Sequence, residues 1–295
     1  MPGPVPAPPA SPPKQRAQAA RTARAVARPG SPVRAEVAGA QTLRRGLMVL
    51  RLLTRVGPGG LRMGDICRQV ALTKATAVRL TQALVDEGFV LKDPASGRYR
   101  LGPEAFAVGL AAEPSYELQR LAAPTLRALA TESEDTVFFS VLHGYETICL
   151  SRDEGDFPIR NQLLKPGDRV PLGVGAGGCA LLAAMGDAEV ADVLAHTRTA
   201  RAQRYPRCTD AALRQMIRET REHGWCVLPG LLLPDSWAVA AVVRDHHAQP
   251  VAAITVAAIR SRLAPARRTA IGQRLLQASA EVTRLALAAA DRRAD

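Results

Sequence analysis

The side chains with the most evident chemistry lie on one short segment that follows Thr73. If this segment is a helix, 100° per residue places Lys74, Ala75, Val78, Arg79 and Gln82 on one side. Arginine bonds guanine O6 and N7, glutamine bonds adenine N6 and N7, and small apolar side chains contact thymine methyl groups. The pattern predicts base recognition in a DNA major groove, with an ordinary solvated helix as the alternative.

The same segment has the features that begin, pack and end a helix. Thr73 is a suitable N-cap, and Gly88 is suited to end the helix. Lys74, in the first turn, is expected to meet a phosphate rather than a base. The side predicted to pack inward carries Thr76, Ala77, Leu80, Ala83 and Leu84.

A basic hairpin is expected to follow this helix, with two strands around a turn at residues 94–97. Arg98 and Arg100 are two apart in a strand, so they share one face, which Lys92 extends. Such side chains position a protein on the phosphate backbone without reading sequence. The opposite face, expected to pack on the helices, carries Tyr99 and Leu101.

The preceding residues supply the elements that hold the reading helix. The pattern becomes helical from residue 41, where Leu43, Leu47 and Leu50 share a face, with Gly46 and Leu53 beside them. A Gly-Pro-Gly-Gly run ends that helix, and a short second helix with a tight turn after it is predicted over residues 63–70. Three helices followed by a two-stranded hairpin predict a winged helix-turn-helix.

The distribution of charge favours the same partner. Within a net charge of +12, residues 1–40 hold 6 basic residues and 1 acidic residue, and residues 41–110 hold 11 and 5. Residues 111–295 hold 22 and 21. A basic region beside a near-neutral body is typical of phosphate binding, with a solvated arginine-rich surface as the alternative. Residues 1–40, rich in Pro, Ala and Arg, predict a disordered tail that adds nonspecific DNA attraction, is inert, or reflects an early start site.

Several classes of function are not expected. The sequence has no apolar run long enough to span a membrane and no evident secretory signal, which predicts a bacterial cytoplasmic, nucleoid-associated protein. The five cysteines form no C-x-x-C pair, which argues against a disulfide framework or a metal site. No catalytic motif occurs, so neither catalysis nor a cofactor is expected. An enzyme acting on a small carboxylic acid and a ligand-independent architectural DNA binder remain as alternatives.

The larger C-terminal part predicts a mixed α/β domain. Residues 103–131 are predicted to be helices that connect two domains, and residues 132–295 mix strands with helices. This order favours an antiparallel or mixed sheet flanked by helices. The predicted strands are residues 136–142, 147–152, 225–228, 238–244 and 251–257, and the predicted helices are residues 175–185, 188–196, 210–222 and a last one from Pro265.

A glycine-rich turn at residues 173–178 precedes one of these helices. Glycines before a helix let backbone N–H groups approach an anion, which the helix dipole also favours. A tight strand-to-helix connection accounts for the same glycines equally well. The turn is not a P-loop, because no Gly-Lys-Ser/Thr follows it.

Together these segments resemble the IclR (isocitrate lyase regulator) family of transcription regulators. The resemblance covers about residues 41–290 and depends on the order and spacing of several motifs. The matching segments are QTLRRGL (41–47), LTKATAVRLTQALVDEGFV (72–90), DPASGRYRLGP (93–103), GDRVPLGVGAGGCALLAAM (167–185), HGWCVLPG (223–230) and VVRDHHAQPVAAITVAAIRSRL (242–263).

The resemblance implies a winged-helix DNA-binding domain joined to a GAF/PAS-like effector-binding domain. It also implies dimers or tetramers that repress or activate catabolic operons in response to small organic acids. A dimer predicts a near-palindromic site on double-stranded DNA. Ala75 departs from the family, where serine is usual. The predicted DNA contacts are Arg45, Thr73, Lys74, Ala75, Thr76, Val78, Arg79, Gln82, Arg98 and Arg100.

The resemblance also places the effector contacts. Thr255 offers a hydroxyl that can donate to a carboxylate. Leu228, where many relatives carry an acidic residue, and Val239 are expected to form apolar walls around an aromatic or alkyl acid. Trp237, next to Ser236, is expected to report binding by fluorescence. The predicted contacts are Gly175, Ala176, Gly177, Leu228, Ser236, Ala238, Thr255 and Ala257.

Overall fold

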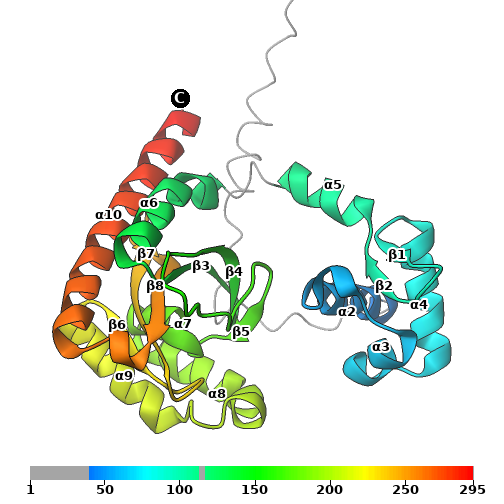
Figure 1. Ribbon diagram of the computed structural model, residues 1–295, viewed down its shortest axis with the longest axis horizontal. Coiled ribbons are helices and arrows are strands. Elements are labelled where there is room, and N and C mark those ends of the chain that lie inside the picture. The colour runs from blue at the N-terminus through cyan, green and yellow to red at the C-terminus, as the bar shows by residue number, and fades with distance from the viewer. Residues whose placement is uncertain (1–39, 113–116, 295) are drawn as a thin grey trace, which may run out of the picture.

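The computed structural model describes residues 40–112 and 117–294 (Figure 1). The tail predicted at residues 1–40 therefore lies, apart from Ala40, outside the described residues. Among the described helices, none is both long and apolar enough to cross a membrane. The fold combines a winged helix-turn-helix with a mixed α/β domain, as the sequence predicts.

The first unit is a winged helix-turn-helix around a small apolar core that includes Val49 and Ile66. β1 and β2 pair antiparallel, with Val90 opposite Leu101. Its elements are α2 (Gln41–Thr54), η1 (Gly57–Gly59), α3 (Met63–Val70), α4 (Lys74–Asp86), β1 (Val90–Lys92) and β2 (Tyr99–Leu101).

The turn between α3 and α4 follows from backbone conformation and a side-chain cap. Ala71 adopts a left-handed φ of 51° and ends α3. The Thr73 hydroxyl accepts a hydrogen bond from the Thr76 N–H at 3.3 Å, which satisfies one free amide at the start of α4. Gly88, with φ of 74°, follows the helix in a conformation that glycine adopts at no steric cost. These features confirm the predicted helix-turn-helix.

The predicted packed face of α2 is confirmed at Gly46 and Leu53 and wrong at Leu43 and Leu47. Leu43 is 65% exposed and Leu47 is also exposed, whereas the buried side carries Gly46, Val49 and Leu53. The helix has apolar side chains on more than one side, so periodicity alone did not select the face that meets the core.

Two smaller packing predictions are also wrong. On α4, Ala83 is exposed and Thr81 is fully buried, because the buried stripe is rotated slightly from the predicted one. On the hairpin, Tyr99 packs against the helical core, but Leu101, the last residue of β2, is exposed. The covered part of the hairpin therefore ends before its last residue.

Two helices connect the winged helix with the sheet. α5 (Pro103–Ala112) buries none of its residues, and its Phe106 is 70% exposed. α6 (Glu117–Ser133) packs with α10 against the sheet through Leu126 and Leu129. The predicted helical character of this stretch is confirmed for the residues that the structure describes.

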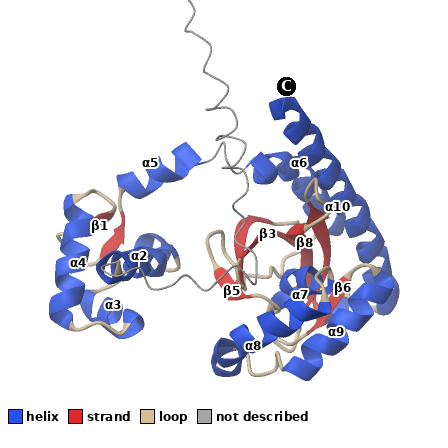
Figure 2. Ribbon diagram, turned by 180° about the vertical axis from the view of Figure 1, so that it is seen from behind, coloured by secondary structure: helices blue, strands red, loops and turns tan. Residues whose placement is uncertain are grey.

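The second unit is a six-stranded sheet in the order β5-β4-β3-β8-β7-β6. Every neighbouring pair of strands is antiparallel. Of the two predicted possibilities, an antiparallel or a mixed sheet, the structure therefore has the antiparallel one. α6 and α10 cover one face and α7 lies on the other, with α9 beside it (Figures 1 and 2). The strands are β3 (Thr136–His143), β4 (Glu146–Asp153), β5 (Arg169–Pro171), β6 (Cys226–Pro229), β7 (Ser236–Arg244) and β8 (Pro250–Ile259). The helices are α7 (Gly175–Ala183), α8 (Asp187–Arg204), α9 (Asp210–His223) and α10 (Pro265–Ala294), with η3 (Arg260–Arg262) before α10.

Each face of the sheet has its own apolar core. Phe138, Leu228 and Ala238 lie in the core under α7, whereas Val239 and Trp237 lie in the core under α6 and α10. Successive residues of a strand point to opposite faces, so neighbours on β7 belong to different cores. The face under α7 is the one that contains the cavity described below.

Candidate functional site

The predicted reading face of α4 is open to solvent. Val78, an apolar β-branched side chain, is 43% exposed there. Gln82 Nε2 donates to Asp86 Oδ1 at 2.8 Å, a bond that must open before the amide can reach a base. The exposed side chains of this face are Lys74, Ala75, Val78, Arg79 and Gln82. Their contacts with bases stay a prediction.

Two further residues of the predicted DNA-contacting set have roles within the fold, and a third is only partly exposed. Thr73 donates from its hydroxyl to Thr76 Oγ1 at 2.9 Å and caps α4, so both threonines shape the helix start. Arg45 is half-buried on α2. Any DNA contact by the two threonines therefore adds to a structural role.

The two wing arginines differ in their surroundings. Arg98 Nη1 donates to the Gly60 carbonyl at 3.1 Å and so braces the wing against the turn after η1. Arg100 is exposed on β2, which begins only at Tyr99, so the prediction that Arg98 and Arg100 lie in one strand is wrong for Arg98. The Asp93 carboxylate accepts bonds from the Ser96 and Ala95 amides, which, with a smaller contribution from Arg100, lower the pKa of Asp93. The wing turn is thus fixed by its own aspartate, and Arg100 is the wing cation best placed to meet a phosphate.

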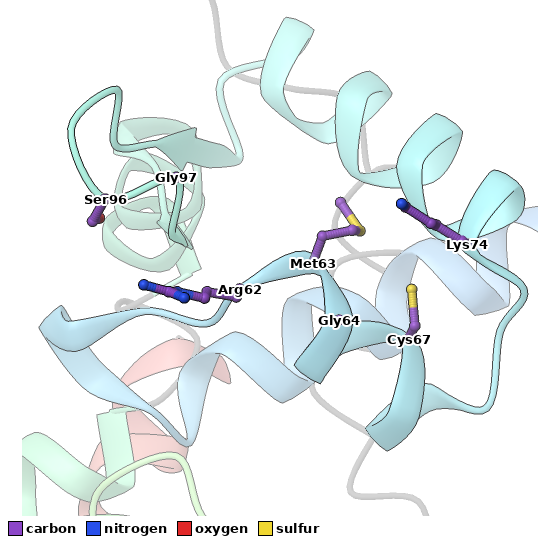
Figure 3. Close-up of a pocket in the computed structure, with 7 residues that line it drawn as sticks. All are labelled: Arg62, Met63, Gly64, Cys67, Lys74, Ser96 and Gly97. Atoms are coloured by element: carbon purple, nitrogen blue, oxygen red, sulfur yellow. The ribbon is translucent and has the colours of Figure 1, made fainter.

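A hollow of about 670 Å³ lies between the start of α3, the start of α4 and the wing turn (Figure 3). Two cations line it: Arg62, which extends toward Ser96 and Gly97, and Lys74, which extends toward Met63 (Figure 3). The sequence analysis did not predict a role for Arg62. Its position directly before α3, the helix that precedes the reading helix, could have indicated one. The hollow joins three segments into one basic surface, which suits a phosphate backbone.

A second cavity, of about 50 Å³, lies between α7 and the sheet. The structure brings all eight predicted effector contacts to it. These are Gly175, Ala176, Gly177, Leu228, Ser236, Ala238, Thr255 and Ala257. These residues come from four separate segments of the chain, so they were predicted as one site only through the resemblance to the family.

The geometry around α7 favours an anion. No side chain caps the helix at Val174, and the first-turn amides of a helix have no acceptor within it. A Cβ built on Gly177 would lie 2.9 Å from Thr255 Oγ1, so the Thr255 hydroxyl lies directly over this turn. Backbone donors and a hydroxyl therefore meet at the positive end of a helix.

The walls of this cavity carry no charged side chain among the residues described. Ser140 and Thr147 are further polar residues, both buried. Leu228 is an apolar wall, as predicted. Val239 is not: it lies on the opposite face of the sheet, and so does Trp237, which packs near Arg268. The expected fluorescence report by Trp237 therefore loses its structural basis.

Asn161 is a cavity residue that the sequence did not indicate. It lies on the loop between β4 and β5, and its Nδ2 donates to Ser236 Oγ at 2.7 Å. Its backbone N–H donates to Thr136 Oγ1 at 3.2 Å. The loop that closes one side of the cavity is thus bonded to both β7 and β3.

The cysteines offer no reactive centre at either site. Cys149, Cys179, Cys208 and Cys226 are buried, and burial raises the pKa of the Cys149 thiol to about 12. Cys67 is the one partly exposed thiol of the five, in the hollow beside Lys74. Within the described part of the chain, no group of His, Cys, Asp and Glu could hold a metal ion.

An exposed reading helix and wing, joined to a domain with a cavity between a helix and the sheet, define a ligand-responsive transcription regulator. Family models agree: residues 42–94 match the IclR helix-turn-helix domain, and residues 111–284 match the C-terminal domain of bacterial IclR transcriptional regulators. This chain belongs to the IclR family.

The relatives support this assignment along most of the chain. The glycerol operon regulatory protein of Streptomyces griseus is 31% identical over 76% of this chain and 87% of its own. The transcriptional repressor AllR of Klebsiella pneumoniae is 29% identical over 83% and 90%. An IclR homologue from Microbacterium hydrocarbonoxydans, solved in complex with 4-hydroxybenzoate, shares the fold with a TM-score of 0.67, 21% identity and coverage of 83% and 98%.

Proposed function

We propose that this regulator binds a small carboxylic acid between α7 and β8, and that the acid changes its affinity for DNA. The observation that carries the proposal is the uncapped start of α7, which meets the Thr255 hydroxyl at the cavity between α7 and the sheet. Converging amides and the helix dipole stabilise a carboxylate without a buried cation. The Microbacterium homologue, whose ligand is an aromatic acid, supports this class of effector.

On the DNA side, we infer that α4 enters the major groove. Arg79 and Gln82 would bond bases, and the exposed Val78 would contact a thymine methyl group. Arg62 and Arg100 would hold phosphates on either side of the helix. Support comes from the exposure of these side chains and from the basic hollow that adjoins α4.

We infer that the DNA-binding form is a homodimer, or a tetramer built from dimers. One winged helix covers too little DNA for high specificity, and a two-fold dimer matches a near-palindromic operator. The exposed apolar side chains Leu43, Leu47 and Phe106 on α2 and α5 suit a contact with a second copy. Residues 41–102 would form the DNA-binding unit, residues 103–131 the connection and residues 132–295 the effector unit, acting at the bacterial nucleoid in the cytoplasm.

Calorimetric titration of the full chain with acetate, propanoate and butanoate tests the effector site. Thr255→Val keeps the shape of the side chain but removes its hydroxyl, so carboxylate affinity should fall about 10- to 100-fold, the value of one charged hydrogen bond. Thr199→Val, on the exposed side of α8, is the matched control and should bind as the parent does. Equal affinity in parent and Thr255→Val would contradict the proposed site.

The link to DNA needs a second measurement. A duplex selected from random sequence is titrated with and without a saturating acid, and the two dissociation constants are compared. Coupling between two sites usually changes affinity about 5- to 150-fold. Acid binding that leaves the DNA affinity unchanged would contradict the regulatory part of the proposal.

A further inference from the structure

The cavity between α7 and β8 is too small for most organic acids. Its volume is about 50 Å³, and one buried water needs roughly 10–15 Å³ measured in the same way. It therefore has room for about four non-hydrogen atoms. This is a carboxylate group with one or two further carbons, as in acetate or propanoate. Any larger acid must extend out of the cavity.

A larger hollow of about 550 Å³ adjoins the cavity and shares Asn161, Leu163 and Ser236 with it. Two leucines from different segments of the chain contribute to its apolar walls. Leu163 is on the β4–β5 loop, and Leu233, 51% exposed, precedes β7. The remaining lining residues are Arg160, Gln162, Pro234, Asp235, Ala258 and Ile259.

The two spaces meet at their shared residues, and a hydrogen bond joins two of these. Asn161 Nδ2 donates to Ser236 Oγ at 2.7 Å, across from the loop to the first residue of β7. Both residues line the small cavity on one side and the larger hollow on the other. A ligand that leaves the cavity in this direction passes the Asn161–Ser236 bond.

The charges of the outer hollow favour an uncharged ligand tail. Arg160 is its one cation among the described residues, and Arg160 is paired with Glu154. Asp235 contributes a carboxylate to the same lining. A second carboxylate on the ligand would therefore meet a neutralised arginine and a like charge, whereas an alkyl or aryl group would cover exposed leucine.

We propose that the cavity and the outer hollow are two compartments of one site for an amphipathic monocarboxylate. The carboxylate lies at the start of α7, and an apolar tail passes Asn161 and covers Leu163 and Leu233. This inference rests on the proposed effector site, and it names the ligand class: acids with a tail of several carbons, rather than short acids or diacids.

The test is a chain-length series of straight monocarboxylates from acetate to octanoate, titrated calorimetrically into the full chain. Beyond propanoate, the dissociation constant should fall with each added carbon by up to about fourfold, the value of burying one methylene group. Octanedioate should bind at least tenfold more weakly than octanoate. Leu233→Ser should weaken octanoate but leave propanoate unchanged, and Leu285→Ser, an exposed leucine on α10, should change neither.

The outcomes separate this inference from the function on which it rests. If short acids bind but affinity is flat or falls beyond propanoate, the two-compartment site is wrong and the effector site stands. The same conclusion follows if Leu233→Ser weakens the binding of propanoate and octanoate equally, or if it weakens the binding of neither acid. If no acid of any length binds, the proposed effector site itself is wrong.

Discussion

Replacing Gly177 by alanine tests directly how α7 lies on the sheet. A Cβ at this position would lie 2.9 Å from Thr255 Oγ1 and 3.3 Å from Ala253 Cβ. Both neighbours are buried on β8, and protein cores are close-packed apart from small cavities such as the one that Thr255 lines. The added methyl group must therefore displace the Thr255 hydroxyl or lift α7 from the sheet.

Two opposing effects set the expected size. Overpacking a core costs about 1–3 kcal/mol of unfolding free energy, and alanine in place of glycine in a helix recovers up to about 1 kcal/mol. We therefore expect Gly177→Ala to destabilise the domain by roughly 0.5–2 kcal/mol. Because Thr255 is displaced, carboxylate affinity should also fall roughly 10- to 100-fold.

Urea unfolding followed by tryptophan fluorescence measures the first effect, since Trp225 and Trp237 both pack in the second unit. Thr255→Ala removes the atom that Gly177→Ala would meet, so in that background the second substitution should cost about 1 kcal/mol less. Gly109→Ala on α5, where an added methyl group meets nothing within 4 Å, is the control and should leave this transition unchanged.

Two results would refute this reasoning. If Gly177→Ala is as stable as the parent and shows no coupling to Thr255→Ala, α7 does not lie against β8 as described. If Gly177→Ala is destabilised but binds carboxylates with the parent's affinity, the ligand does not occupy the space beside Gly177.

Three other predictions concern DNA binding, assembly and pH. Arg79→Ala should lose about 1–3 kcal/mol on the preferred duplex and relax its preference at one base pair per half-site, whereas Arg100→Ala should weaken preferred and scrambled duplexes alike and lower the salt slope by about one. Equal behaviour would contradict the assignment of helix and wing. Phe106→Asp should shift the proposed dimer toward monomer in sedimentation, and an unchanged sedimentation coefficient would contradict a contact at Phe106. The hydrogen bond from Arg201 is the main cause of the lowered pKa of Asp210, so its stabilising effect is present above the unfolded pKa near 3.8 and is lost as pH falls below it. Asp210→Asn should therefore flatten the acid side of the stability–pH curve; an unchanged curve would contradict this role.

Local chemistry made much of the DNA-binding unit predictable. Thr73 and Gly88 mark the ends of α4 by side-chain capping and backbone freedom, which act within a few residues and are visible in any single sequence. The buried face of α2 was not predictable in this way. Leu43 and Leu47 look like core residues, and only tertiary packing reveals that Val49 faces the core instead.

The effector site shows a different limit. Its eight predicted residues were found through the resemblance, but Val239 was added beside Ala238 although neighbours on a strand point to opposite faces. That error was avoidable from the sequence. Asn161 was not: it lies on an irregular loop and reaches Ser236 across 75 positions of the chain, a pairing that no local pattern contains.

The loop that carries Asn161 also connects the cavity with the end of α6. The Gly155 and Phe157 amides donate to the Asp135 and Glu134 carbonyls at 3.1 and 2.9 Å, directly after the last turn of α6. The Phe157 ring lies 3.8 Å from the guanidinium of Arg262, and Arg262 Nε bonds the Asp135 carboxylate at 2.8 Å. In the proposed site, a ligand tail that displaced Asn161 would act on a segment bonded to the residues directly after α6, the helix that leads into the sheet. Since a ligand shifts an equilibrium only through different affinities for two states, the proposed ligand would act on DNA binding through this loop only if its tail favoured one arrangement of the loop over another.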